Sequence, residues 1–87
     1  MNFTHLAANG AATIGSSGIG IKVHTVCINT KGAAANTLTL AQGATTIAVI
    51  DTVNLATNVL IYDVDTTGPV TATLATGTAA DITITWQ

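Results

Sequence analysis

Apolar and polar residues alternate with a period of two along much of this chain. Thr37–Leu40, Val70–Leu74 and Ile82–Trp86 each place an apolar side chain at every second position, with threonine between them. Successive side chains of a strand point to opposite faces, so each segment has one apolar face and one threonine face. This arrangement is typical of antiparallel sheets that pack on one side only.

Turn-forming residues divide the chain into about eight such segments. Asn9-Gly10, Gln42-Gly43 and Thr67-Gly68-Pro69 fall between apolar runs and supply the backbone angles that tight connections need. The pattern predicts an all-β fold, a small antiparallel β-sandwich or barrel that forms a single domain over residues 1–87. The predicted strands are residues 2–6, 11–15, 19–29, 36–41, 45–50, 58–64, 69–75 and 80–86.

Two stretches depart from this alternation. The apolar phase that begins at Ile19 changes between Val23 and Val26. This change predicts a bulge or bend near His24 that re-aims the strand between sheets. The run Val59–Tyr62 is apolar on both faces, so we expect a strand that is either central in the core or pressed against a partner.

Charged residues are scarce, at 7% of the chain against about 25% in an ordinary soluble domain. No apolar run approaches the roughly 20 residues of a membrane-spanning helix. Disorder requires low hydrophobicity and high net charge, whereas this chain is 48% apolar with a formal net charge of -2. Two basic residues are too few to neutralise a nucleic-acid backbone. We therefore expect a folded protein whose uncharged surface contacts other protein.

The apolar inventory is poor in large side chains. Fifteen alanines carry much of the apolar fraction, and Phe3, Tyr62 and Trp86 are the only aromatic residues. Alanine buries little apolar area. The free energy gained by hydrophobic burial therefore exceeds the entropy cost of ordering the chain by only a small margin. The single cysteine, Cys27, cannot form an intrachain disulfide. We therefore predict a homo-oligomer, for example a trimer, whose subunits bury further surface against one another.

Residues able to do chemistry are few. A serine of the Ser16-Ser17 pair could be combined with His24 and Asp63 into a nucleophilic triad, but the serines lie in a glycine-rich turn without a nucleophile-elbow pattern. Cys27 and His24 are three residues apart, which puts them on opposite faces of a regular strand. A hairpin loop and an inert thiol are the simpler interpretations, and we expect no enzymatic activity.

Metal binding has a similarly weak basis. Asp63 and Asp65 share one face of a predicted strand. Further carboxylates are available at Asp51 and Asp81. Calcium prefers six or more oxygen ligands from a dedicated loop, and that spacing is missing from the sequence. Carboxylates that cap a turn are the simpler interpretation, the histidines lack the spaced partners of a zinc site, and we expect no metal and no cofactor.

The two ends of the chain hold most of its large side chains. Phe3, His5 and Leu6 lie near one end, and Trp86 lies near the other. Such residues either complete the core or contact a neighbouring subunit, because strands at chain ends readily add to another sheet. Both interpretations stay open, and the candidate interface residues are Phe3, His5, Leu6 and Trp86.

Four stretches resemble small β-sandwich structural proteins of tailed bacteriophages and prophages. These stretches are Met1–Leu6, Val23–Gly32, Leu60–Val64 and Thr76–Trp86. The resemblance implies a virion component, first of all a capsid decoration or cement protein that binds the major capsid protein lattice and stabilises it. Such a protein is made in the host cytoplasm and lies on the capsid surface. The resemblance supplies no catalytic, metal or cofactor residues.

Two other functions stay open. One is a structural component of the phage tail or neck. The other is a small carbohydrate-binding module, which needs exposed aromatic platforms and converging polar groups. Tyr62 and Trp86, side by side on an exposed face, would favour that module. The first residues lack the basic start and the apolar run of a signal peptide, so we expect synthesis without export.

Overall fold

Eight strands and no helix make up the part of the chain that the computed structural model describes, residues 1–55 and 57–87. The all-β prediction is therefore confirmed. The largest difference from the predicted bounds is at the third strand, which starts at Lys22 because Ile19–Ile21 belongs to the preceding connection. The strands are β1 Asn2–Leu6, β2 Gly10–Ile14, β3 Lys22–Thr30, β4 Thr37–Gln42, β5 Thr45–Asp51, β6 Val59–Asp65, β7 Val70–Ala75 and β8 Asp81–Trp86.

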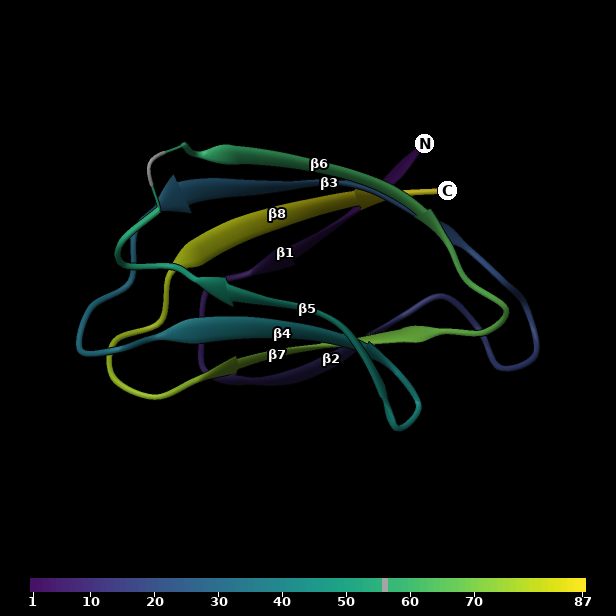
Figure 1. Cartoon of the computed structure of the whole chain (residues 1–87), viewed down its shortest axis with the longest axis horizontal. Helices are drawn as coiled ribbons and strands as arrows, with labels where there is room; N and C mark the ends of the chain where they lie inside the picture. The colour runs from purple at the N-terminus through teal and green to yellow at the C-terminus, as the bar shows by residue number, and fades with distance from the viewer. Residues whose placement is uncertain (56) are drawn as a thin grey trace.

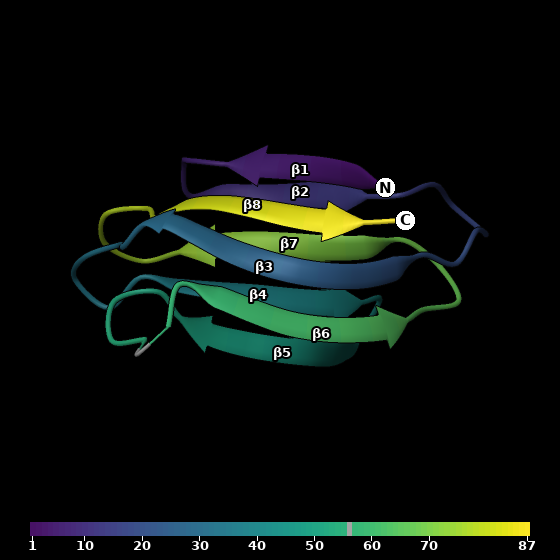
Figure 2. The same cartoon turned by 90° about the horizontal axis from the view of Figure 1, so that it is seen from above.

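The strands form two four-stranded sheets that pack face to face (Figure 1). Sheet A has the order β1-β8-β3-β6 and sheet B the order β2-β7-β4-β5, with antiparallel neighbours throughout. This strand order is that of a jelly roll, a sandwich built from two Greek keys. Figure 2 shows β1 and β2 along one side of the sandwich and β5 and β6 along the opposite side.

The core between the sheets is built from branched aliphatic side chains and alanine. The inward positions of the strands other than β1 and β6 supply most of its buried members, with the period of two that the sequence predicts, and β1 and β6 pack partly buried side chains against it. Tyr62 and Trp86 pack only at its periphery, as does Leu6. Its buried members are Ile14, Ile21, Val23, Val26, Ile28, Leu38, Leu40, Ile50, Val70, Ala72, Leu74, Ala80, Ile82 and Ile84.

Strand β3 contains the predicted bulge. Its register against β8 shifts between Val23 and Thr25, so His24 is the extra residue. Val23 and Val26 are both fully buried, in agreement with the change of apolar phase. The expectation that the bulge re-aims the strand between sheets is wrong, because β3 pairs with β6 and β8 on both sides of it and stays in sheet A. The bulge instead brings His24 beside Thr25 on the outer face.

Strand β6 lies at an edge of sheet A, so the central position that its apolar run allowed is wrong. It pairs with β3 alone among the described strands. Val59 and Ile61 point to solvent, whereas Leu60 and Tyr62 pack against the core. Contact of the exposed pair with a partner stays a prediction.

All four connections at one end of the sandwich meet at a buried asparagine, Asn36, which precedes β4. Its amide group donates to Oδ1 of Asn9 in the β1–β2 connection at 2.9 Å, and to two carbonyl oxygens at the end of β7 at 2.9 and 3.2 Å. Its Oδ1 accepts from Oγ1 of Thr52, which follows β5, at 2.7 Å. The same oxygen accepts from the backbone N–H of Ala80 at 3.1 Å. Asn36 thus fixes the inter-sheet connections relative to one another.

The opposite end is held by a close crossing of two connections. A Cβ atom at Gly20 would lie 2.1 Å from the carbonyl oxygen of Thr66. The N–H of Thr66 donates to the carbonyl oxygen of Ile21 at 2.8 Å, and the N–H of Ile21 donates to Oγ1 of Thr66 at 3.1 Å. Glycine at position 20 therefore lets the β2–β3 connection pack directly on the β6–β7 connection.

We expect Asn36→Ala to lower the free energy of unfolding by about 3 kcal/mol, because each buried polar group left without a partner costs about 1–3 kcal/mol. The groups affected include the N–H of the fully buried Ala80 and Oγ1 of the fully buried Thr52. Urea denaturation measures the change. Asn58→Ala, in an exposed connection, serves as the control and should leave stability nearly unchanged. Equal stability of the two variants would contradict the role of Asn36.

Candidate interaction surface

The structure divides the four candidate interface residues between the outer face of sheet A and the core. Phe3 and His5 of β1 are exposed on the outer face, paired with the outward-facing threonines of β8. Leu6 and Trp86 pack against the core instead. The indole N–H of Trp86 donates to Oγ1 of Thr4 at 3.0 Å, which satisfies its polar atom within the fold. Phe3 and His5 therefore remain available for contact, and Trp86 contributes mainly to packing.

Large apolar side chains are exposed at both edges of sheet A. Phe3 on β1 is 71% exposed, and on β6 Ile61 is 69% and Val59 50% exposed. The strand registers put Phe3 and Ile61 at the two ends of one row across the sheet. The residues between them in this row are Thr85 and Thr25. The apolar run of β6 was the sequence signal for Val59 and Ile61, but its edge position could not be derived from that run.

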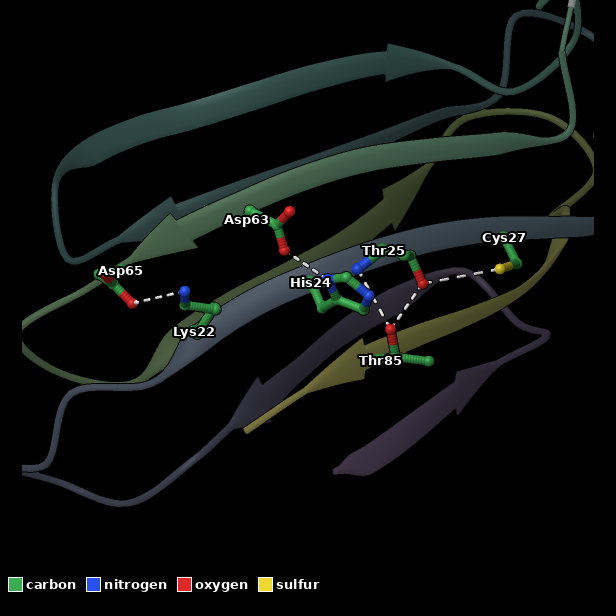
Figure 3. A network of polar contacts seen from close by, with 7 residues as sticks. All are labelled: Lys22, His24, Thr25, Cys27, Asp63, Asp65 and Thr85. Atoms are coloured by element: carbon green, nitrogen blue, oxygen red, sulfur yellow. Dashed lines mark hydrogen bonds and ion pairs between the residues drawn. The ribbon is translucent and has the colours of Figure 1, made fainter.

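The centre of this face is a cluster of small polar side chains (Figure 3). Oγ1 of Thr25 lies 2.5 Å from Oγ1 of Thr85, and the N–H of Thr25 donates to the same Thr85 oxygen at 3.1 Å. Oγ1 of Thr25 also lies 3.8 Å from Sγ of Cys27, a free thiol that is half-buried. The two threonine hydroxyl groups thus bond to each other between the two apolar edges.

A hydrogen bond and an ion pair join β3 to β6 beside this cluster (Figure 3). Nδ1 of His24 contacts Oδ1 of Asp63, and Nζ of Lys22 lies 3.9 Å from Oδ1 of Asp65. Asp63 has a positive φ of 47°, a conformation that non-glycine residues rarely adopt, and it lies where the β3–β6 register shifts. The side chain of Asp65 is 78% exposed, so its charge remains largely open to solvent.

A third polar group lies toward the other end of the same face. Oδ1 of Asp81 accepts from Nδ2 of Asn29 at 2.9 Å and contacts Nε2 of His5 at 2.7 Å. These hydrogen bonds, first that of Asn29 and then that of His5, hold the pKa of Asp81 below its usual value. The group ties β1 and β3 to β8 across the sheet and leaves His5 exposed.

The structure brings together only some of the residues that the sequence offered as catalytic candidates. His24 and Asp63 are in contact, but among the described residues neither side chain of Ser16-Ser17 hydrogen-bonds to His24. The expectation that His24 and Cys27 lie on opposite faces is wrong, because the bulge places both on the outer face (Figure 3). Cys27 bonds to Thr25 there, with no hydrogen bond to His24 within the described chain.

The carboxylates are distributed as separate pairs. Asp63 and Asp65 share the outer face of β6, as the alternation predicts, but each contacts a different basic side chain of β3. The turn cap expected of Asp63 and Asp65 is found instead at Asp51, which accepts from the side chain of Asn54 and the backbone N–H of Val53, and these hydrogen bonds lower its pKa. In residues 1–55 and 57–87, the histidine, cysteine and aspartate side chains form no group of three that could hold a metal ion.

The outer face of sheet B differs from that of sheet A because it is nearly free of charge. Its strands carry one charged residue, Asp51, at the end of β5, whereas the strands of sheet A carry both histidines, Lys22 and the other three aspartates. Small side chains cover the face. They are Ala11, Thr13, Thr39, Ala41, Thr71 and Thr73.

No pocket is found among the described residues. Tyr62 and Trp86 both turn toward the core and do not make an exposed aromatic platform. Burial raises the pKa of Tyr62, which fits its inward position. None of the described residues form a helix with the length and hydropathy needed to cross a membrane.

Comparisons with known proteins give a fold relationship without a family. A scan against protein families finds no match, and a search of curated proteins finds no relative. Among solved structures, the chain is similar to the Drosophila NLP-core, whose crystal structure addresses pentamer formation and histone binding. The TM-score is 0.62 at 14% sequence identity, over 99% of this chain and 94% of that chain. At this identity the likeness shows the fold alone.

We expect Trp86→Ala to lower the free energy of unfolding by about 2 kcal/mol, since truncation of a packed aromatic side chain leaves a cavity. Phe3→Ala should change it by less than about 0.5 kcal/mol, because Phe3 is largely exposed within a single chain. Chemical denaturation at a concentration that keeps the protein dissociated measures both. A Phe3 variant that is as destabilised as the Trp86 variant would show that Phe3 belongs to the core.

We expect the stability of the fold to fall as the pH drops below about 4, in part because of Asp81. Its pKa is lower in the folded than in the unfolded chain, so the unfolded chain takes up the proton first. The contribution is present above the unfolded pKa and is lost as the pH falls through the folded pKa. Melting temperatures measured from about pH 5 to about pH 3 should fall less steeply for Asp81→Asn than for the wild type. Equal slopes would contradict this contribution.

Proposed function

We propose that this chain is a non-enzymatic structural protein of a bacteriophage particle, which forms a symmetric homo-oligomer and decorates the major capsid lattice. The observation that carries the proposal is the exposure of Phe3, Val59 and Ile61 on a sandwich that is otherwise nearly free of charge. Contiguous exposed apolar groups mark contact surfaces in soluble proteins, and Val59 and Ile61 are neighbours on the exposed face of β6. A surface with few charges also repels its own copies weakly, which suits dense packing on a lattice.

The composition of the core supports the homo-oligomer. The buried side chains are aliphatic, and the aromatic residues lie at the periphery or on the surface. A domain of this size buries a smaller share of its surface than larger domains do, so contacts with neighbours add stability that the single chain lacks. The Drosophila NLP-core, which shares the fold, is described in terms of pentamer formation. Its histone binding is not proposed for this chain, because 14% identity does not carry a binding site.

The jelly roll supports the virion assignment in a general way, because this architecture recurs in viral capsid and lectin domains. A fold hosts many functions, so the argument depends on the surface. A lectin-like function requires a recess with aromatic platforms, and both Tyr62 and Trp86 pack against the core. Decoration requires only flat, self-compatible surfaces in many copies. On this proposal the protein is made in the host cytoplasm and lies on the outer surface of the capsid.

We expect the purified chain to sediment with capsids of the encoding phage that were assembled without it, and to saturate at a fixed number of copies per capsid. The bound chain should raise the temperature at which the capsids open, because a ligand that binds only the intact lattice stabilises it. Quantitative gel analysis of the pellet and a thermal release assay measure these effects. Tail structures purified from the same phage are the comparison. Binding to tails without binding to capsids would replace the decoration role by a tail role, and binding to neither would refute the proposal.

A further inference from the structure

We propose that copies of this chain join head to tail, with the β1/β2 side of one copy against the β5/β6 side of the next. The β1/β2 side is Asn2–Leu6 with Gly10–Ile14, and the β5/β6 side is Thr45–Asp51 with Val59–Asp65. The two sides lie opposite each other in the sandwich (Figure 2). The inference rests on the proposed function for one point only, that the chain forms a homo-oligomer.

Exposed apolar side chains lie on both of these sides. Phe3 occupies the β1/β2 side, and Val59 and Ile61 occupy the β5/β6 side. On the same side Val49 of β5 is 65% exposed, on the outer face of sheet B. When two copies stand with their A sheets edge to edge, Phe3 of one copy comes next to Ile61 of the other, because both end the same row on the outer face. Phe3 and Ile61 then bury part of their exposed surface against each other.

The charges favour contact between unlike sides. The β5/β6 side carries Asp51, Asp63 and Asp65, which are three of the four acidic residues of the chain. The β1/β2 side carries no acidic residue and a single titratable side chain, His5. Two β5/β6 sides in contact would bring the aspartates of both copies together, although Lys22 partly offsets the charge of Asp65. A contact between the β1/β2 side of one copy and the β5/β6 side of the next avoids this repulsion.

The edge strands of the two sides also differ in the regularity of their strand pairing. The β1–β8 and β2–β7 registers run without a shift, whereas those of β5 with β4 and of β6 with β3 are each shifted once. Bulged edges resist the addition of a continuous strand. The contact is therefore made by side chains, and it does not extend one flat sheet from copy to copy. A head-to-tail contact of this kind closes into a ring when the rotation between copies permits.

The strands of each side are shorter than the molecule. The backbone measures 35 × 21 × 18 Å, whereas five to seven residues of strand extend about 17–23 Å. Two proteins that associate specifically bury about 800 Å² each, so the contact also includes the connections that flank these strands. A copy within a ring uses both sides, which leaves the two outer sheet faces open to other partners.

The test uses the full chain, native mass spectrometry and two variants that each place a carboxylate on one side. Phe3→Asp alters the β1/β2 side, and Ile61→Asp alters the β5/β6 side. Each variant alone should be monomeric, because every contact needs one side of each kind. An equimolar mixture should form a dimer of one copy of each and nothing larger, through the two unaltered sides. Ile19→Asp, which alters an equally exposed residue outside both sides, should keep the wild-type mass.

Circular dichroism establishes whether each variant is folded. If an aspartate variant is not folded, the serine variant at the same position is used in its place. Dimers formed by one variant alone would show contact between like sides and overturn the inference. A mixture that stays monomeric, variants that assemble as the wild type does, or a wild type that is monomeric at its solubility limit would also overturn it. Sedimentation with capsids tests the proposed function separately. If the chain is monomeric but still saturates the capsids, the decoration role is supported and the head-to-tail ring is contradicted.

Discussion

The buried amide of Asn36 is the interaction on which the arrangement of the two sheets depends. A jelly roll passes its chain repeatedly from one sheet to the other, and at this end all four passages meet at one side chain. The aliphatic core is non-directional and would tolerate several relative positions of these connections. Hydrogen bonds to Asn9, Thr52 and Ala80 select one of them. In the described part of the chain no buried side-chain nitrogen or oxygen lacks a partner, so this polar centre is fully satisfied and favours a single ordered state.

With the sheets fixed in this way, the two outer faces acquire different chemical character. Sheet A carries the histidines and three aspartates, which are tied into pairs between neighbouring strands, and sheet B presents alanine, threonine and Val49. The edges differ as well, because the bulges and most of the acidic residues lie on the β5/β6 side. A small domain with little charge thus obtains surfaces that are not equivalent. On the proposed function, that inequality would let the protein distinguish a neighbouring copy from the capsid lattice.

The alternation of residues was sufficient to predict the all-β class, eight strands and the bulge at His24, because strand periodicity and its interruption are local properties. The same periodicity places Trp86 in phase with the buried Ile84, which indicates core, although its position near the chain end suggested an interface. Edge and centre depend on strand order, which is not local, so the exposure of Ile61 could not be derived from its apolar run. Asn36 is one of six asparagines, and only the meeting of distant connections sets it apart.

The pairing of β1 with β8 has a consequence for how the molecule forms. Phe3 lies opposite Thr85, so among the described strands β1 pairs only with β8, about 80 residues later in the sequence. Contacts between residues so distant in sequence close large loops and form late, which slows folding. On the ribosome, β1 remains without a partner until residues 81–86 have left the exit tunnel. The β1/β2 side therefore does not form until residues 81–86 are available, and the self-association proposed for that side is delayed until then, which limits premature aggregation of incomplete chains.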